Sequence, residues 1–181
     1  IGGASISATA TYDPNSGSGA ATPGGVGAND YSGTAYTAKV VFGSVTVGGG
    51  IEESEAANAT GAGEDNATGY IVVKHGPIGV MYQEFYKNEA NSASAEGRDY
   101  EGDTWGVSFS QGDWAISWVE NEETKKGNSD TAAGKTTTME ALNFSYTMGA
   151  MAIKGGLFET SNPEFTTGKF EATEIAVSFA F

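Results

Sequence analysis

Apolar and small polar residues alternate along almost the whole chain with a period of two. The clearest case is the last eleven residues, 171–181. There, Thr173, Ile175, Val177, Phe179 and Phe181 are apolar or β-branched, and the residues between them are small or polar. Because alternate residues of a strand point to opposite faces, this pattern predicts a strand with one bulky apolar face and one small polar face.

The same alternation predicts about ten strands in a single domain that covers residues 1–181. Proline is scarce, with 4 residues, which suits paired strands because proline removes a ladder donor. The chain contains no run of about 18 apolar residues that could form a transmembrane helix. The predicted strands are 4–12, 36–42, 45–51, 69–75, 78–86, 104–110, 114–118, 142–148, 151–157 and 171–181.

The connections between these strands alternate in length. Short turns are expected at 43–44, 76–77, 111–113 and 149. Long connections rich in Gly, Ser, Asn and acidic residues are expected at 13–33, 53–68, 87–103, 120–137 and 159–170. Hairpins with one tight end and one long end are typical of membrane barrels. We therefore predict an all-β fold, a transmembrane antiparallel up-and-down β-barrel, with both chain ends on the side of the short turns.

The two faces of the strands predict two environments. The bulky face would meet lipid, and its aromatic residues would form girdles at the membrane interfaces. These residues are Tyr36, Phe42, Trp105, Trp114, Trp118, Tyr146, Phe179 and Phe181. The small face would line a water-filled pore, in which charged side chains tune ion selectivity. The predicted pore-lining residues are Lys39, Glu52, Asn143, Lys154 and Glu174, whereas the register of Lys74 stays open.

The chain is strongly acidic, with 23 Asp and Glu against 9 Lys and Arg and a formal net charge of −14. This balance argues against nucleic acid as a partner, since nucleic-acid binding needs a basic surface. It predicts attraction of cations that weakens as salt shortens the Debye length. The spacing of Asp99, Glu101 and Asp103 resembles the start of a calcium loop, which makes these residues candidate Ca²⁺ ligands in the acidic outer loops. No other cofactor is expected.

The residues give no sign of an enzyme. The chain has no cysteine and one histidine, His75, beside the expected turn at Gly76 and Pro77. A hydrolase needs a nucleophile activated by a nearby base, and no such set of residues stands out. We therefore expect the protein not to be an enzyme.

The segment from Ile175 to Phe181 resembles the C-terminal assembly signal of Gram-negative outer-membrane barrels. The hairpin from Tyr146 to Phe158 looks like the last hairpins of general diffusion porins, nearest in style to the alphaproteobacterial branch. This resemblance implies a bacterial outer-membrane location, a homotrimer, contact with the lipid bilayer and lipopolysaccharide, and recognition of the last strand by the barrel assembly machinery. It also implies passive diffusion of ions and small hydrophilic solutes.

Porins of that family have sixteen strands, so the resemblance implies that this chain corresponds to the C-terminal ten. Their inward-folded constriction loop and its facing arginines are not matched here, because Arg98 is the only arginine. Two alternatives stay open. The chain could be a small closed outer-membrane barrel with a structural or adhesion role through acidic loops. It could also be a soluble secreted β-sandwich that binds a ligand through its loops.

Overall fold

The computed structural model describes residues 3–13, 31–56, 64–89, 98–126 and 134–179. These residues form one antiparallel sheet and a single short 3₁₀ turn, η1, at Pro163–Phe165. No helix in the described ranges is long and apolar enough to cross a bilayer. The strands are β1 (Ala4–Asp13), β2 (Tyr31–Phe42), β3 (Val45–Ala56), β4 (Glu64–His75), β5 (Ile78–Glu89), β6 (Arg98–Gln111), β7 (Trp114–Lys126), β8 (Thr136–Met148), β9 (Met151–Ser161) and β10 (Lys169–Phe179).

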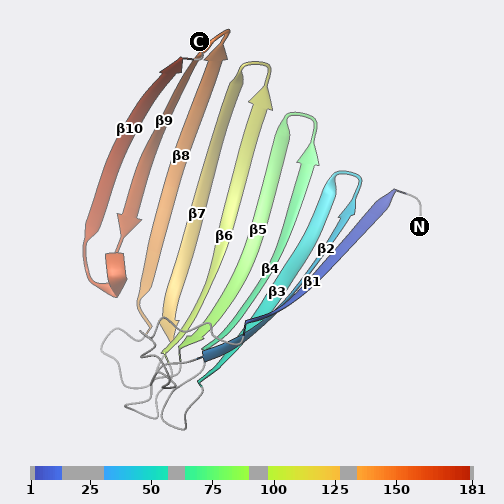
Figure 1. Ribbon diagram of the computed structural model, residues 1–181. Helices are drawn as coiled ribbons and strands as arrows, with labels where there is room; N and C mark the ends of the chain where they lie inside the picture. Colours follow the sequence, from blue (N-terminus) through green and yellow to red (C-terminus); the bar gives the residue numbers. More distant parts are fainter. Residues whose placement is uncertain (1–2, 14–30, 57–63, 90–97, 127–133, 180–181) are drawn as a thin grey trace, which may run out of the picture.

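The 10-stranded sheet follows the order of the chain from β1 to β10, and each strand pairs with the next. This confirms the predicted all-β up-and-down architecture. Figure 1 shows the sheet curved into a trough, in which β1 begins and β10 ends on the side of the short turns. The strands β1 and β10 are not paired with each other, so the described sheet is open.

Each short turn contains a glycine in the left-handed region of backbone space. The φ angles are 57° at Gly43, 56° at Gly76, 60° at Gly112 and 58° at Gly149. Two-residue hairpins whose twist matches that of the strands require positive φ, which glycine adopts without a steric penalty. The four glycines thus fix the tight end of four hairpins and confirm the predicted short turns.

The strands extend farther toward the long connections than we predicted. For example, β7 continues to Lys126 and β8 begins at Thr136, within the connection predicted at 120–137. Asp99, Glu101 and Asp103 were expected in an outer loop, but they lie within β6. The predicted boundaries are wrong because the apolar alternation ends several residues before the backbone pairing does.

The sheet has no hydrophobic core. Among the described residues, no hydrophobic side chain is buried, and the buried polar side chains are Lys125 and Thr137. Large apolar side chains are instead exposed, for example Ile6 at 75% and Ile175 at 69%. Water disfavours apolar surface on this scale, and soluble domains bury theirs between packed layers. The exposed apolar surface therefore needs a nonaqueous neighbour.

Candidate channel wall

The strand register assigns every described residue to one of two faces. Residues directly opposite each other in an antiparallel pair lie on the same face. We name the face that contains Ile175, Val177 and Phe179 the outer face, and the face that contains Ala176 and Ser178 the inner face. Following the register from β10 to β1 places all the large exposed hydrophobic side chains on the outer face except Met139, Phe158 and Phe170.

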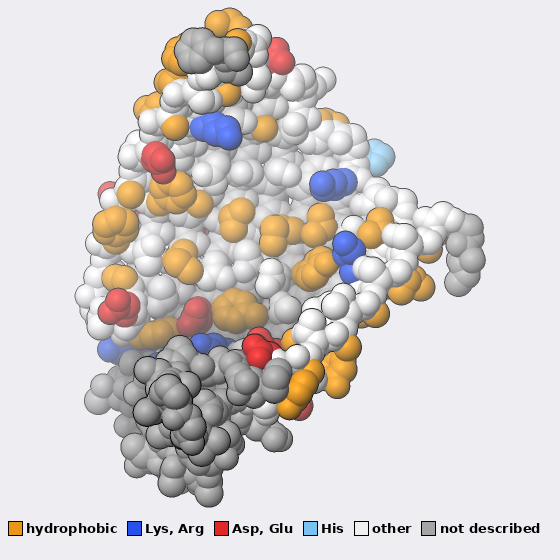
Figure 2. Space-filling view, viewed as in Figure 1, with side chains coloured by type: hydrophobic (Ala, Val, Ile, Leu, Met, Phe, Trp, Pro, Cys, Tyr) orange, Lys and Arg blue, Asp and Glu red, His pale blue; other side chains and the backbone are white. Residues whose placement is uncertain are grey.

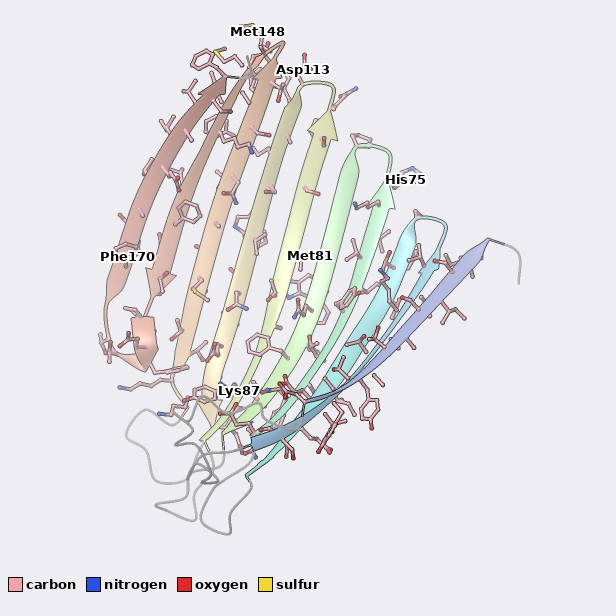
Figure 3. The ribbon with its side chains drawn as sticks, in the orientation of Figure 1. His75, Met81, Lys87, Asp113, Met148 and Phe170 are labelled. Atoms are coloured by element: carbon pink, nitrogen blue, oxygen red, sulfur yellow. The ribbon has the colours of Figure 1, made fainter. Side chains whose placement is uncertain are left out.

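The inner face is the hollow side of the trough. Figure 2 looks onto this side and shows a surface that is mostly backbone and small polar side chains, with hydrophobic patches and scattered charges between them. In Figure 3, Met81 and Lys87 lie on this side, whereas His75, Asp113 and Met148 lie near the short turns. A concave polar face opposite a convex apolar face is the arrangement of a membrane barrel that encloses water.

Large inner side chains lie against the wall instead of projecting into the hollow. Tyr70 covers Gly48, its register partner, and a Cβ added there would stand 2.6 Å from Cζ of the ring. Phe85 covers Gly102 in the same way, with its Cζ 2.5 Å from such a Cβ. The glycines thus provide the space that keeps these rings out of the hollow.

The inner face carries as many lysines as carboxylates among the described side chains. The predicted pore-lining residues Lys39, Glu52, Asn143, Lys154 and Glu174 all lie on it, and the register also assigns Lys74 to it. The lysines are Lys39, Lys74, Lys87, Lys125 and Lys154, and the acidic residues are Asp13, Glu52, Glu64, Glu123 and Glu174.

These inner charges are separated along the strands. Lys39, Lys74 and Lys154 lie in the half of the wall near the short turns, where Glu174 is the accompanying acid. Most of the inner carboxylates lie toward the long connections, together with Lys87 and Lys125. The described wall is therefore more basic at its short-turn end and more acidic at its other end.

The predicted interfacial aromatics lie on the outer face as far as the structure describes them. Those near the short turns are Phe42, Trp114, Tyr146 and Phe179, and those at the opposite limit of the apolar band are Tyr36, Trp105 and Trp118. Phe181 lies outside the described residues. Trp114 and Tyr146 are register partners, and the centroids of their rings are 4.3 Å apart.

The sequence analysis missed a row of acidic side chains on the outer face. Each strand from β3 to β10 places a carboxylate on the outer face near the end of its apolar residues, directly beyond them in six strands, before Tyr86 in β5 and after Thr173 in β10. We call this row the carboxylate belt: Glu53, Asp65, Glu84, Asp103, Glu120, Glu140, Glu159 and Glu171. The signal that could have revealed the belt is in the sequence: along every second residue of each strand, the side chains change from apolar to acidic.

Within this belt, four glutamates are consecutive register partners. Glu120 lies opposite Glu140, which lies opposite Glu159, and Glu159 lies opposite Glu171. Lys169 compensates one end of this row, with its Nζ 2.9 Å from Glu159 Oε2 and 2.7 Å from Glu171 Oε1. Like charges placed directly opposite each other destabilise a sheet. The Glu120–Glu140 half of the row therefore carries repulsion in the described wall.

The calcium ligands considered above do not converge. Asp99, Glu101 and Asp103 occupy alternate positions on one face of β6. The Cα atoms of successive members are therefore about 6.5 Å apart along the strand. Glu101 instead pairs with Lys126, with 2.5 Å between Oε1 and Nζ. Among the described residues, no group of three or more His, Cys, Asp or Glu could hold a metal ion. Calcium binding in the acidic outer loops stays a prediction.

The connection between β9 and β10 turns over the inner face. The Thr137 hydroxyl donates to the Asn162 carbonyl at 2.8 Å, and Asn162 Nδ2 donates to the Thr136 carbonyl at 3.1 Å. Phe165 then reaches Tyr100 of β6 with 5.6 Å between ring centroids. The sequence analysis placed this segment in a long connection and did not predict its inward course.

Three residues of this connection adopt positive φ without being glycine. The angles are 51° at Asn162, 52° at Glu164 and 59° at Phe165. Such backbone conformations are costly for residues with a side chain and persist where the surroundings hold them. Here the hydrogen bonds to β8 and the contact with Tyr100 hold the segment against the inner face, at the end of the trough near the long connections.

Comparison with known proteins agrees with this geometry. No protein-family model and no curated protein matches the sequence. Among solved structures, a porin refined at 1.8 Å resolution matches with a TM-score of 0.73 and 19% sequence identity. The match covers 100% of this chain and 59% of the porin. The chain therefore has a porin-type fold, as the resemblance in its last hairpins implied, and it spans about three fifths of that porin's length.

Proposed function

We propose that this chain forms part of the wall of an outer-membrane porin, a water-filled channel for passive diffusion of ions and small hydrophilic solutes. The observation that supports this most strongly is that the two faces of this one-layer sheet differ in chemical character. The outer face carries the exposed apolar side chains, and the inner face carries small polar residues with balanced charge. A layer with these faces is stable when lipid covers one side and water fills the other.

A larger barrel accounts for the open sheet. The strands β1 and β10 have free edges in the described sheet, and unpaired edges do not occur in contact with hydrocarbon. The likeness to a porin that is longer than this chain supports a barrel completed by further strands. We propose a sixteen-stranded barrel, of which this chain supplies ten strands. The small closed barrel with a structural or adhesion role is less favoured, because the two edge strands do not meet.

We further propose that the channel prefers cations and that the protein works as an outer-membrane homotrimer. Inner carboxylates near the long connections, such as Glu52, Glu64 and Glu123, support cation attraction at that mouth. The lysines near the short turns oppose it, so the preference should be weak. Contacts with lipopolysaccharide, and recognition of β10 by the barrel assembly machinery, remain part of this proposal on the strength of the terminal sequence alone.

Single cysteines test the proposal, since the chain has none of its own. Lys39 lies on the inner face and Val40, the next residue, lies on the outer face, so Lys39→Cys and Val40→Cys form a matched pair. The protein is reconstituted in planar bilayers and exposed to a membrane-impermeant, sulfonate-bearing thiol reagent. We expect a stepwise change of conductance for Lys39→Cys and none for Val40→Cys.

Two results would contradict the proposal in different ways. A correctly inserted protein that never conducts would favour the structural or adhesion role. A conducting protein in which Val40→Cys responds and Lys39→Cys does not would reverse the assignment of the two faces. Repeating the pair with Glu174→Cys and Ile175→Cys on β10 guards against a local disturbance of β2.

A further inference from the structure

A hollow with a largely apolar lining and a few charged and polar groups lies in the wall over strands β6 to β10. Its volume is about 510 Å³, and the side chains that enter it include Asn143, Lys154, Phe158 and Glu174. Gly156 is among the residues that line it. A Cβ atom at Gly156 would stand 2.7 Å from the Phe158 ring and 2.9 Å from Asn143 Oδ1, so this glycine lets those two side chains lie against the wall beside the hollow. We call this site the inner-wall hollow.

The inner-wall hollow contains one cation and one anion that do not neutralise each other. Lys154 lies opposite Ala176, so Glu174 is its diagonal neighbour across β9 and β10, at a Cα separation of roughly 7–8 Å. Within the described part of the chain, Lys154 and Glu174 form no ion pair, unlike Lys169 with Glu159 and Glu171. Both side chains are exposed to the hollow. A solute that enters between them meets an ammonium group on one side and a carboxylate on the other.

The rest of the hollow supplies hydroxyl groups and a larger apolar lining. Ser108, Ser117 and Ser145 line it with hydroxyl groups, which can donate and accept. Ser117 lies opposite Asn143, and Ser145 lies opposite Lys154. The apolar lining includes the Phe158 ring, which is 37% exposed, together with Phe109, Ile116 and Phe144. The site thus offers two opposite charges and neutral polar groups on a largely apolar surface.

We propose that the inner-wall hollow is a weak binding site for small zwitterionic solutes, with the solute carboxylate at Lys154 and its ammonium group at Glu174. A lone anion or cation would be attracted by one of these groups and repelled by the other. A neutral solute would gain hydrogen bonds alone. Because the two charges are exposed to water, each contact is weak, which suits a site that a solute must leave again.

This inference rests on the proposed channel function, and two readouts separate their failures. The first is the ion current through the protein in planar bilayers as β-alanine, a small zwitterion, is added. We expect a saturable decrease with β-alanine and little change with lactamide, a neutral solute of similar size. The second is saturation-transfer NMR of the same two solutes with the detergent-solubilised protein, which detects contact whether or not the protein conducts.

Variants of the two charges identify the site. Lys154→Gln and Glu174→Gln should each raise the β-alanine concentration for half-maximal effect about threefold, as expected for one exposed charge contact. The exchange Lys154→Glu with Glu174→Lys should restore the effect, because a zwitterion can bind in the reverse orientation. Lys169→Gln removes a lysine from the outer face and should leave the concentration unchanged.

Several outcomes would overturn the inference. Equal effects of β-alanine and lactamide, or effects of β-alanine that survive both glutamine substitutions, exclude a zwitterion site at these residues. A conducting protein without a β-alanine effect in either readout overturns the site and leaves the channel standing. If the protein does not conduct but its NMR contact with β-alanine is lost in Lys154→Gln, the channel function is contradicted and the binding site is supported.

Discussion

Phe165 contacts Tyr100 across the width of two strands. Tyr100 lies on the inner face of β6, and the connection that carries Phe165 leaves β9 and crosses over β8 and β7 to reach it. Lys125 of β7 also lies against the Phe165 ring, with its Nζ 6.0 Å from the centroid of that ring. This contact and the hydrogen bond from Thr137 to Asn162 hold the connection over the inner face, at the end of the trough near the long connections.

Removal of the Phe165 ring should widen this end of the proposed channel. We expect Phe165→Ala to raise the single-channel conductance and its fluctuations, because the connection loses its contact with Tyr100 and Lys125. Thr137→Val should act in the same direction, since its hydroxyl donates to the Asn162 carbonyl and accepts from the Phe165 amide at 3.3 Å. Thr138→Val, at the next position and on the outer face, is the control. Conductance identical in all four proteins would show that the connection does not narrow the path.

The contact between Tyr70 and Gly48 leads to a second prediction. A side chain at Gly48 would push the Tyr70 ring away from the wall and into the hollow, so Gly48→Val should lower the conductance. Gly69 is the matched control. It lies on the outer face next to Tyr70, and a Cβ there would meet nothing within 4 Å, so Gly69→Val should conduct as the unchanged protein does. Unaltered conductance of Gly48→Val would mean that the ring already lies outside the ion path.

A lysine scan of β10 should distinguish lipid from water. Ile175 faces outward and Ala176 faces inward. We expect Ile175→Lys to destabilise the folded protein in lipid vesicles by about 2–4 kcal/mol if the position lies near the bilayer midplane, because the charge loses its hydration. Ala176→Lys should cost much less. Urea unfolding in vesicles, followed by tryptophan fluorescence, measures both values. Similar costs at the two positions would contradict the assignment of the faces.

The row of glutamates gives a prediction about stability. Glu140 has a glutamate directly opposite it on each side, so Glu140→Gln should relieve repulsion and stabilise the protein by about 0.5 kcal/mol. The melting temperature in detergent at neutral pH and low salt should therefore rise. Added salt screens exposed charges, so the difference from the unchanged protein should shrink as ionic strength increases. A lower melting temperature for Glu140→Gln would indicate that this carboxylate makes a favourable contact instead.

Periodicity alone was sufficient to predict the class of fold, the short turns and the faces of the strands. The period of two in β10 placed Ile175 outward and Glu174 inward, and the register agrees because a one-residue slip would reverse every side chain. The short turns could be predicted equally well from their glycines, since Gly43 and Gly149 adopt the positive φ that tight hairpins require. These features are local, so a single sequence contains them.

What the sequence analysis missed depends on relations between distant segments. The end of β7 was predicted too early and the start of β8 too late, because Glu120, Glu122 and Thr136 have no apolar alternation although their backbones are paired. The carboxylate belt emerges only when registers are compared across strands. The inward course of the β9–β10 connection depends on Thr137 and Tyr100, which precede it in the chain by many residues and share no motif with it.

Every strand in the described sheet takes its partners from the adjacent strands of the chain. Such a sheet can gain or lose one hairpin at a time, because an inserted hairpin pairs with the strand before it and presents an equivalent edge to the strand after it. Barrel diameter grows nearly in proportion to strand number, so the hairpin is the unit in which pore size can change. Duplication or deletion of a segment the length of one hairpin would then be an evolutionary route to channels of different calibre, with the remaining pairs left intact.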